Sequence, residues 1–219
     1  MDSKCPQTYD EVLRTLFENY SDLLACEEDV HAAARLVTDS FRLGGKLLVC
    51  GNGGSAADSE HVVGELMKSF RFKRPVDSAF VESYRKANGI DAPTWLEGAL
   101  PAISLVSQTA LSTAFGNDEV AVGVFAQQVY GYGKPGDVLL AISTSGNSAN
   151  VVEAVRVARA KGVHVVSLTG SQESTLTPLS NICIRVPRSE VFRVQELHLP
   201  VYHALCAAAE AELFGCVNE

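Results

Sequence analysis

The segment 46–65, KLLVCGNGGSAADSEHVVGE, constrains the fold of this chain more than any other part of the sequence. Its apolar run, residues 47–50, is typical of a strand that is buried on both faces. The glycine-rich turn that follows lets the backbone reverse sharply, and Ser55 is then expected to cap a helix. A helix that begins there points unpaired N–H groups at whatever lies beyond the strand. The segment therefore predicts an α/β fold with an anion-binding turn.

Two side chains on the predicted helix can do chemistry. His61 and Glu65 are four residues apart, so they share one helix face and can act together on a substrate or bind a metal. The competing interpretation is an ordinary surface pair, which this spacing often produces. The glycine turn does not decide between them, because it matches neither G-x-G-x-x-G nor the P-loop pattern.

The rest of the chain alternates strands and helices, after two amphipathic helices at 8–26 and 30–43. The expected strands are 102–106, 138–142, 163–169 and 182–186, and the expected helices are 119–131, 149–161 and 191–214. This rhythm predicts a doubly wound, mostly parallel sheet flanked by helices, with an N-terminal helical extension. Ligands of such sheets bind beyond the carboxyl ends of the strands.

A chain of 219 residues with 47% hydrophobic content is expected to form a single domain, 1–219. The N-terminal helices occupy 1–43 and a C-terminal helix 191–216. Residues 71–100 contain Pro75, Gly89 and Pro93, which interrupt regular secondary structure. We therefore expect an irregular segment there, with turns of helix at 81–86 and 94–97.

A second polar loop follows the most apolar predicted strand. Residues 143–148 read STSGNS, and their hydroxyls and backbone N–H groups can surround a phosphate at a strand-to-helix junction. Such loops are also ordinary turns and caps, and the sequence leaves the two interpretations open. Another polar turn is expected at 116–118.

The composition excludes several classes of partner. The formal net charge of −8 is spread along the chain without a basic run, which disfavours nucleic acid. No signal peptide or membrane span is expected, so we predict a cytoplasmic protein. The six cysteines form no C-x-x-C pair and are expected to be free thiols.

Four motifs, CGNGGSAADSEH, AFGND, AISTSGNSANV and VQELHLPVYH, occur in this order. Together they resemble the sugar isomerase (SIS) domain of the phosphoheptose isomerase family, which has a flavodoxin-like sandwich. The resemblance runs from about residue 36 to 214 and is interrupted by an insertion at 76–100. It implies isomerisation of sedoheptulose 7-phosphate to D-glycero-D-manno-heptose 7-phosphate by a homotetramer whose active sites lie between subunits.

The resemblance also implies roles for individual residues. The implied substrate-binding residues are Asn52, Gly53, Gly54, Ser55, Glu65, Asn117, Asp118, Ser143, Thr144, Ser145, Ser148 and Gln195. The implied proton-transfer pair is Glu65 and His203, and the implied zinc ligands are His61, Glu65, Gln195 and His203. Phe192 departs from the small polar or acidic residue that many members have at that position.

Aldose–ketose isomerisation through an enediol needs two positioned proton-transfer groups. We expect Glu65 to remove the proton from carbon and His203 to transfer the other proton. A zinc ion bound by nitrogen and oxygen ligands would polarise the carbonyl. Two alternatives remain. One is a non-catalytic SIS-domain protein of the type that binds the bacterial replication initiator, in which the catalytic pair is lost. The other is an isomerase or sensor of a different sugar phosphate.

Overall fold

The computed structural model describes residues 7–215, and its centre is one sheet of five parallel strands. The strands are β1 (Leu47–Cys50), β2 (Ala102–Ser104), β3 (Val138–Ile142), β4 (His164–Thr169) and β5 (Ile182–Arg185). Their spatial order is β2-β1-β3-β4-β5, and every described pairing is parallel. The predicted strand–helix alternation is confirmed.

The strands separate two apolar layers, because alternate side chains of a strand point to opposite faces. In β1, Leu47 and Val49 belong to one core cluster, whereas Leu48 and Cys50 belong to the other. All five residues of β3 are buried. This two-sided burial explains why the strands read as continuous apolar runs rather than alternating ones.

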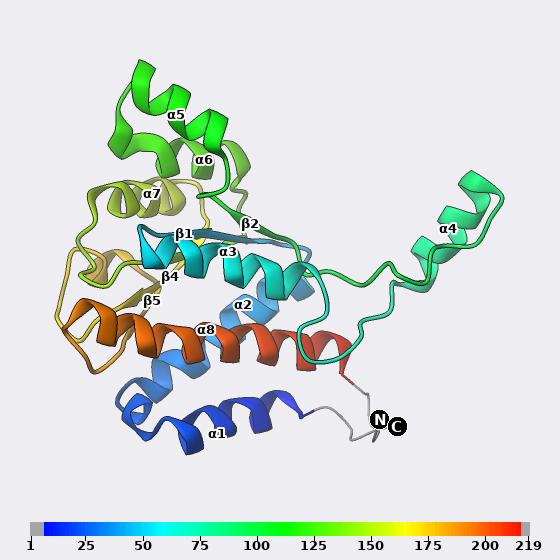
Figure 1. Cartoon of the computed structure of the whole chain (residues 1–219), viewed down its shortest axis with the longest axis horizontal. Helices are drawn as coiled ribbons and strands as arrows, with labels where there is room; N and C mark the ends of the chain where they lie inside the picture. Colours follow the sequence, from blue (N-terminus) through cyan, green and yellow to red (C-terminus); the bar gives the residue numbers. More distant parts are fainter. Residues whose placement is uncertain (1–6, 216–219) are drawn as a thin grey trace.

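Helices cover both faces of the sheet (Figure 1). The α-helices are α1 (Tyr9–Asn19), α2 (Glu27–Arg42), α3 (Gly54–Met67), α4 (Ser78–Asn88), α5 (Thr109–Asp118), α6 (Val124–Tyr132), α7 (Ala149–Ala160) and α8 (Val191–Phe214). The short 3₁₀ helices are η1 (Ser21–Cys26), η2 (Ala121–Gly123) and η3 (Thr177–Leu179). The helices α6 and α7 pack on one face, and α1, α2, α3 and α8 lie on the other.

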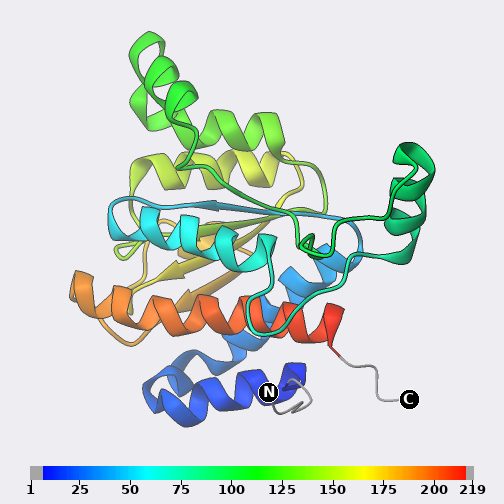
Figure 2. The ribbon, with the colours of Figure 1, turned by 45° about the vertical axis from the view of Figure 1, so that its right-hand side comes forward.

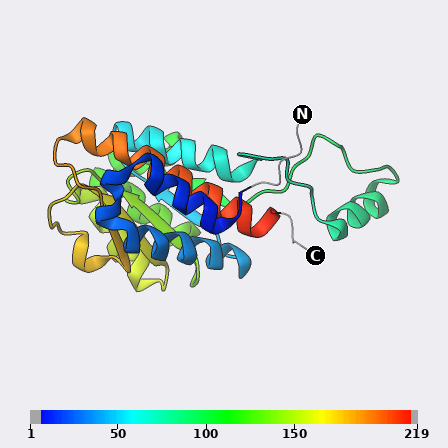
Figure 3. The ribbon, with the colours of Figure 1, turned by 90° about the horizontal axis from the view of Figure 1, so that it is seen from below.

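The N-terminal helices pack on the chain's own last helix, as the view from below shows (Figure 3). A capping box formed by Thr8 and Glu11 begins α1. The apolar face of α1 is buried, with Leu13 fully inaccessible to solvent. The predicted single helix over 8–26 is wrong in one respect, because the α-helix stops at Asn19 and η1 follows.

In the glycine turn after β1, the residue that caps the following helix differs from the prediction. The helix α3 begins at Gly54 with Gly53 as its N-cap, at a φ of +57° that favours glycine. Ser55 lies inside the first turn and is buried, and its N–H donates to the Asn52 carbonyl. The N-cap assignment to Ser55 is therefore wrong by two residues, although the strand–turn–helix path is confirmed.

The insertion forms an arm that leaves the body between α3 and β2 (Figure 2). It is more ordered than expected, because residues 78–88 form the continuous helix α4 with an Asp77 cap. None of the side chains of α4 is buried. The arm closes at its base, where Gly98 N donates to Arg74 O at 3.0 Å.

The predicted polar turn at 116–118 is also wrong, because these residues form the last turn of α5. The next α-helix starts at Val124 rather than at 119. Over residues 7–215, no helix is both long and apolar enough to cross a membrane. The four cysteines in this range, Cys26, Cys50, Cys183 and Cys206, are free thiols as predicted, and the other two lie outside the described residues.

Candidate active site

Three ionisable side chains from α3 and α8 converge in the structure. His61 Nε2 lies 3.1 Å from Glu65 Oε1, which confirms that this pair shares one helix face. His203 reaches the same point from α8, and its Nε2 lies 3.5 Å from His61 Nε2. The helices α3 and α8 run side by side (Figure 1), so residues far apart in the sequence form one cluster.

A second layer of hydrogen bonds orients His61. The Tyr202 hydroxyl donates to Asp58 Oδ1 at 3.2 Å, and its oxygen lies 3.0 Å from His61 Nδ1. This arrangement assigns the Nδ1 proton to His61, because the hydroxyl proton is already engaged by Asp58. In a neutral His61 the Nε2 lone pair then faces the Glu65 carboxylate. Two acceptors meet at this point, which calls for a proton or a cation between them.

Burial sets the charge state of His203. Desolvation lowers the pKa of this imidazole, the neighbouring His61 lowers it further, and Glu65 opposes both. The Phe70 ring contributes to this burial, with its centroid 5.4 Å from that of His203. A neutral imidazole at pH 7 can accept a proton, as the predicted role of His203 requires. Desolvation likewise raises the pKa of Asp58, while its bond from Tyr202 acts in the opposite direction.

Gln195 lies further toward the amino end of α3. A Cβ placed on Gly54 would come within 2.4 Å of Gln195 Nε2, so a side chain at this glycine would collide with the amide. The implied substrate residue Gly54 and the implied zinc ligand Gln195 are thus in close contact. The glycine leaves room for the Gln195 amide in this position, and a larger residue would require that side chain to move.

The implied zinc ligands partly fit a metal. The separations of 3.1 and 3.5 Å between neighbouring donor atoms bracket the ~3.4 Å edge of a tetrahedron with Zn–N bonds of about 2.0–2.1 Å. In a neutral His61, the facing acceptors His61 Nε2 and Glu65 Oε1 would be satisfied by a cation as well as by a proton. However, within residues 7–215 no group of three or more His, Cys, Asp or Glu side chains is arranged to hold a metal ion. The donor chemistry fits zinc, but the described side chains do not close around one point.

The two polar loops meet at the carboxyl edge of the sheet. Asn52 and Asn150 exchange two amide hydrogen bonds of 2.9 Å, which join the turn after β1 to the start of α7. In the second loop, the Ser143 and Ser148 hydroxyls are 3.0 Å apart, and Ser145 Oγ accepts the Asn147 N–H at 3.2 Å. The loop leads directly into α7, so its hydroxyls lie beside an open helix N-terminus.

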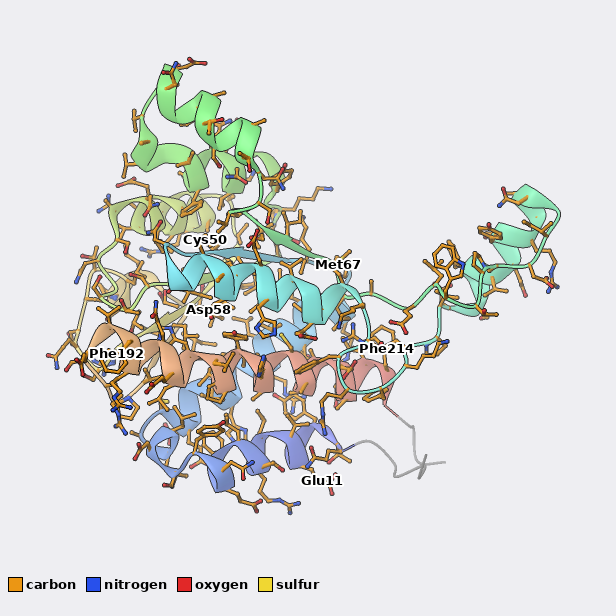
Figure 4. The ribbon with its side chains drawn as sticks, viewed as in Figure 1. Glu11, Cys50, Asp58, Met67, Phe192 and Phe214 are labelled. Carbon is orange, nitrogen blue, oxygen red and sulfur yellow. The ribbon has the colours of Figure 1, made fainter. Side chains whose placement is uncertain are left out.

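Asn117 and Asp118 are not brought to this cluster within the described chain. The Asn117 amide donates to Asp118 Oδ1 at 2.9 Å, and both side chains are exposed at the end of α5. Figure 1 shows α5 beyond α6, across the sheet from α8. Phe192 lies at the amino end of α8 (Figure 4), where Arg193 stacks on its ring at 5.0 Å.

Sequence reasoning missed Asp58, Tyr202 and Asn150. Asp58 carried a usable signal, because it lies three residues before His61 and so on the same side of α3. Asn150 belongs to the second loop motif but follows its last hydroxyl. Tyr202 had no such signal, since an aromatic residue in an apolar helix predicts only a core position, and its contacts depend on how α8 packs.

A pocket of about 280 Å³ opens beside His203 between α1 and α8. Phe70, Arg71 and Pro200 line it together with the apolar face of α1. The imidazole of His203 therefore borders both the cluster with His61 and a cavity at the surface.

Comparisons with known proteins find similarity over most of the chain. The family model of the SIS domain matches residues 8–170. This match includes the N-terminal helices, which the motif resemblance from residue 36 did not, and it ends before α8. The chain is 40% identical over 188 residues to a phosphoheptose isomerase of Rhodospirillum rubrum, covering 86% of this chain and 88% of the relative. A phosphoheptose isomerase of Akkermansia muciniphila is 36% identical over 198 residues, covering 90% and 93% of the two chains.

Solved structures extend the similarity to the fold. A phosphoheptose isomerase of Francisella tularensis superposes with a TM-score of 0.73 at 30% identity, covering 94% of this chain and 100% of that one. One from Neisseria gonorrhoeae gives a TM-score of 0.68 at 31% identity, over 90% and 98% of the two chains. The N-terminal helices, the parallel sheet and α8 thus form a known arrangement, and this chain belongs to the phosphoheptose isomerase family of SIS-domain proteins.

Proposed function

We propose that the chain isomerises sedoheptulose 7-phosphate to D-glycero-D-manno-heptose 7-phosphate. The observation that carries this proposal is the convergence of Glu65 and His203 on His61, with both members of the expected proton-transfer pair present. The curated relatives, which match over most of their length, are phosphoheptose isomerases. A non-catalytic binding protein of this fold would have no need to retain this pair.

The reaction moves hydrogen between neighbouring carbons without changing the composition of the sugar. The Glu65 carboxylate would take a proton from the hydroxymethyl carbon, C1, and the electron pair would move to form the C1–C2 enediol. His203 would exchange protons with the two oxygens, so that O1 loses its proton and O2 gains one. Return of a proton to C2 then leaves an aldehyde at C1 and a hydroxyl at C2.

We also propose zinc as a ligand of this site, held by His61, Glu65, His203 and Gln195. The support is the donor set of imidazole nitrogens and oxygens, together with the facing lone pairs of His61 and Glu65. When bound, zinc would supply Lewis acidity toward the substrate's carbonyl oxygen.

The remaining proposals concern where and how the chain works. We propose a homotetramer in the cytoplasm. The four free thiols between residues 7 and 215 are consistent with a reducing compartment. The separation of the α5 candidates from the His61 cluster is consistent with sites that are completed across subunits.

A turnover assay tests the reaction. We expect the purified chain to convert sedoheptulose 7-phosphate to the aldose, and Glu65→Gln and His203→Ala each to lower kcat at least ~100-fold, the scale for losing a proton-transfer group. Arg14→Gln is the control. It breaks the exposed ion pair of Arg14 with Glu18 on α1 and should retain kcat.

Three readouts decide between the possibilities. Near-normal turnover in either site variant would remove that residue from catalysis. Absence of turnover in the unaltered chain, with turnover of another ketose phosphate, would assign a different substrate. Elemental analysis of the purified protein, before and after dialysis against a chelator, tests zinc directly, and a chain that never contains stoichiometric zinc would refute the metal proposal.

A further inference from the structure

A fully buried ion pair lies close to the site without belonging to it. Arg74 Nε donates to Glu210 Oε1 at 2.8 Å, and both side chains are 0% exposed. Burying two charges is costly unless further hydrogen bonds satisfy them, and buried pairs are often no better for stability than apolar residues. Such a pair therefore needs an explanation beyond the stability of the fold.

The guanidinium is bonded to the peptide groups that end α3. Arg74 Nη1 donates to the Leu66 carbonyl at 2.6 Å, and Nη2 donates to the carbonyl of Glu65 itself at 2.9 Å. The last carbonyls of a helix lack partners within the helix and are stabilised by a positive charge. Arg74 thus fixes the turn of α3 that carries the Glu65 side chain.

The carboxylate of Glu210 is bonded to the segment that follows α3. It accepts the Phe70 N–H at 2.8 Å and the Arg71 N–H at 2.9 Å. The Phe70 ring in turn packs on His203, at 5.4 Å between centroids. Glu210 also stands seven residues after His203, on the same side of α8.

These contacts join the two helices of the site at one end. Figure 4 labels Met67, the last residue of α3, and Phe214, the last residue of α8, toward the same end of these two helices. The Arg74 guanidinium also stacks on the Phe214 ring at 5.3 Å. One buried pair therefore connects the Glu65 turn, the Phe70 segment and α8.

We propose that Arg74 and Glu210 are positioning residues that hold Glu65 and His203 at their working separation. This inference rests on the proposed function, since it assigns a role to the pair in proton transfer. The pair contacts no group of the 143–148 loop, so it acts on the chemical step and not on phosphate binding. Misplacement of a catalytic group by about 1 Å can reduce turnover ~100-fold.

The test uses conservative and apolar replacements. Arg74→Lys keeps the charge but loses the guanidinium group, whose two Nη atoms donate to the Leu66 and Glu65 carbonyls. Glu210→Gln keeps one acceptor oxygen. The double variant Arg74→Met with Glu210→Leu removes both charges together, which proteins often tolerate without loss of the fold. We expect each to lower kcat by about 100-fold while KM changes by less than about threefold.

Asp137→Asn provides the matched control. It breaks another nearly buried ion pair, Lys46 Nζ to Asp137 Oδ2 at 2.5 Å, at the amino ends of β1 and β3. This control should lower the free energy of unfolding, as Arg74→Lys is also expected to do, but leave kcat unchanged. If folded pair variants keep the kcat of the control, or if KM rises in proportion to any loss, the positioning role is refuted.

A readout independent of activity separates this inference from the proposed function. The imidazole ¹⁵N resonances of His203 should shift in the double variant and remain in place in Asp137→Asn. Unchanged resonances in the double variant would overturn the positioning role even in an active enzyme. Lack of turnover in the unaltered chain would instead refute the proposed reaction, and the resonances would still test whether the pair positions His203.

Discussion

At the residue scale, His198 is a buried titratable group that the proposed reaction does not use. It is 0% exposed, and neither ring nitrogen has a hydrogen-bond partner among residues 7–215. Burial lowers its pKa to about 4, although the backbone of Thr169 lies close enough to oppose part of this shift. The charged imidazole is thus unfavourable inside the fold, while an unfolded histidine titrates near 6.5.

This depressed pKa predicts a pH dependence of stability. Between about pH 6.5 and pH 4 the unfolded chain binds more protons at His198 than the folded chain, so the free energy of unfolding falls as the pH falls. The full loss from this one group is roughly 3 kcal/mol. Urea denaturation at pH 7, 6 and 5 should show the slope, and His198→Met should reduce it.

His31→Gln is the control, because this histidine is 45% exposed on α2. The control should keep the slope of the unaltered chain. An equal slope in His198→Met and in His31→Gln would show that other groups govern the acid sensitivity.

At the element scale, the loop between β3 and α7 should act on substrate binding and not on proton transfer. Its Ser143 and Ser148 hydroxyls lie 3.0 Å apart just before α7, and Gly146 at a φ of +64° makes the turn possible. We expect Ser145→Ala combined with Ser148→Ala to raise KM by about 10-fold or more with a smaller effect on kcat, because hydrogen bonds to a charged phosphate contribute about 1.5–3 kcal/mol each.

The serine pair Ser167 and Ser180 offers a matched control. Their hydroxyls are 2.5 Å apart, and Ser180 precedes β5 at the amino edge of the sheet. Ser180→Ala should therefore leave KM unchanged in the same steady-state assay. An unchanged KM in the double variant would mean that the phosphate binds elsewhere.

In the whole molecule, the N-terminal helices pack on the last helix of their own chain. The apolar faces of α1 and α2 are buried against α8 within one chain, so deleting residues 8–26 would expose α8 rather than test assembly. The stronger argument for shared sites is the distance in the fold between α5 and the His61 cluster (Figure 1).

Light scattering at micromolar concentration should show four chains, and a mixing experiment should show that they share sites. Asn117→Ala with Asp118→Ala in one chain, and Glu65→Gln in another, should each be inactive alone. Unfolding the two together and refolding the mixture should restore part of the turnover, because some mixed sites would contain only native residues. A monomer with full activity, or an inactive mixture of tetramers, would refute shared sites.

Local patterns in the sequence are enough to predict the sheet and its two polar loops. Apolar runs such as 138–142 can be satisfied only by burial on both faces, and their alternation with helices leads to a parallel sheet. The spacing of His61 and Glu65 fixed their common face for the same local reason. These properties depend on residues that are close together in the chain, so they can be predicted from the sequence.

The contacts between groups far apart in the sequence could not be predicted from local patterns. The contact of His203 with His61, the link from Tyr202 to Asp58 and the bonds from Arg74 to the end of α3 all depend on how α8 packs against α3. The helical continuation through Asn117 and the start of α3 at Gly54 also differ from the sequence-based expectation, since the local signals favoured a turn and a serine cap. From the sequence alone, Arg74 would be predicted to lie on the surface, as most arginines do. Its partner Glu210 is 136 residues away, and only the folded chain brings the two together and buries them.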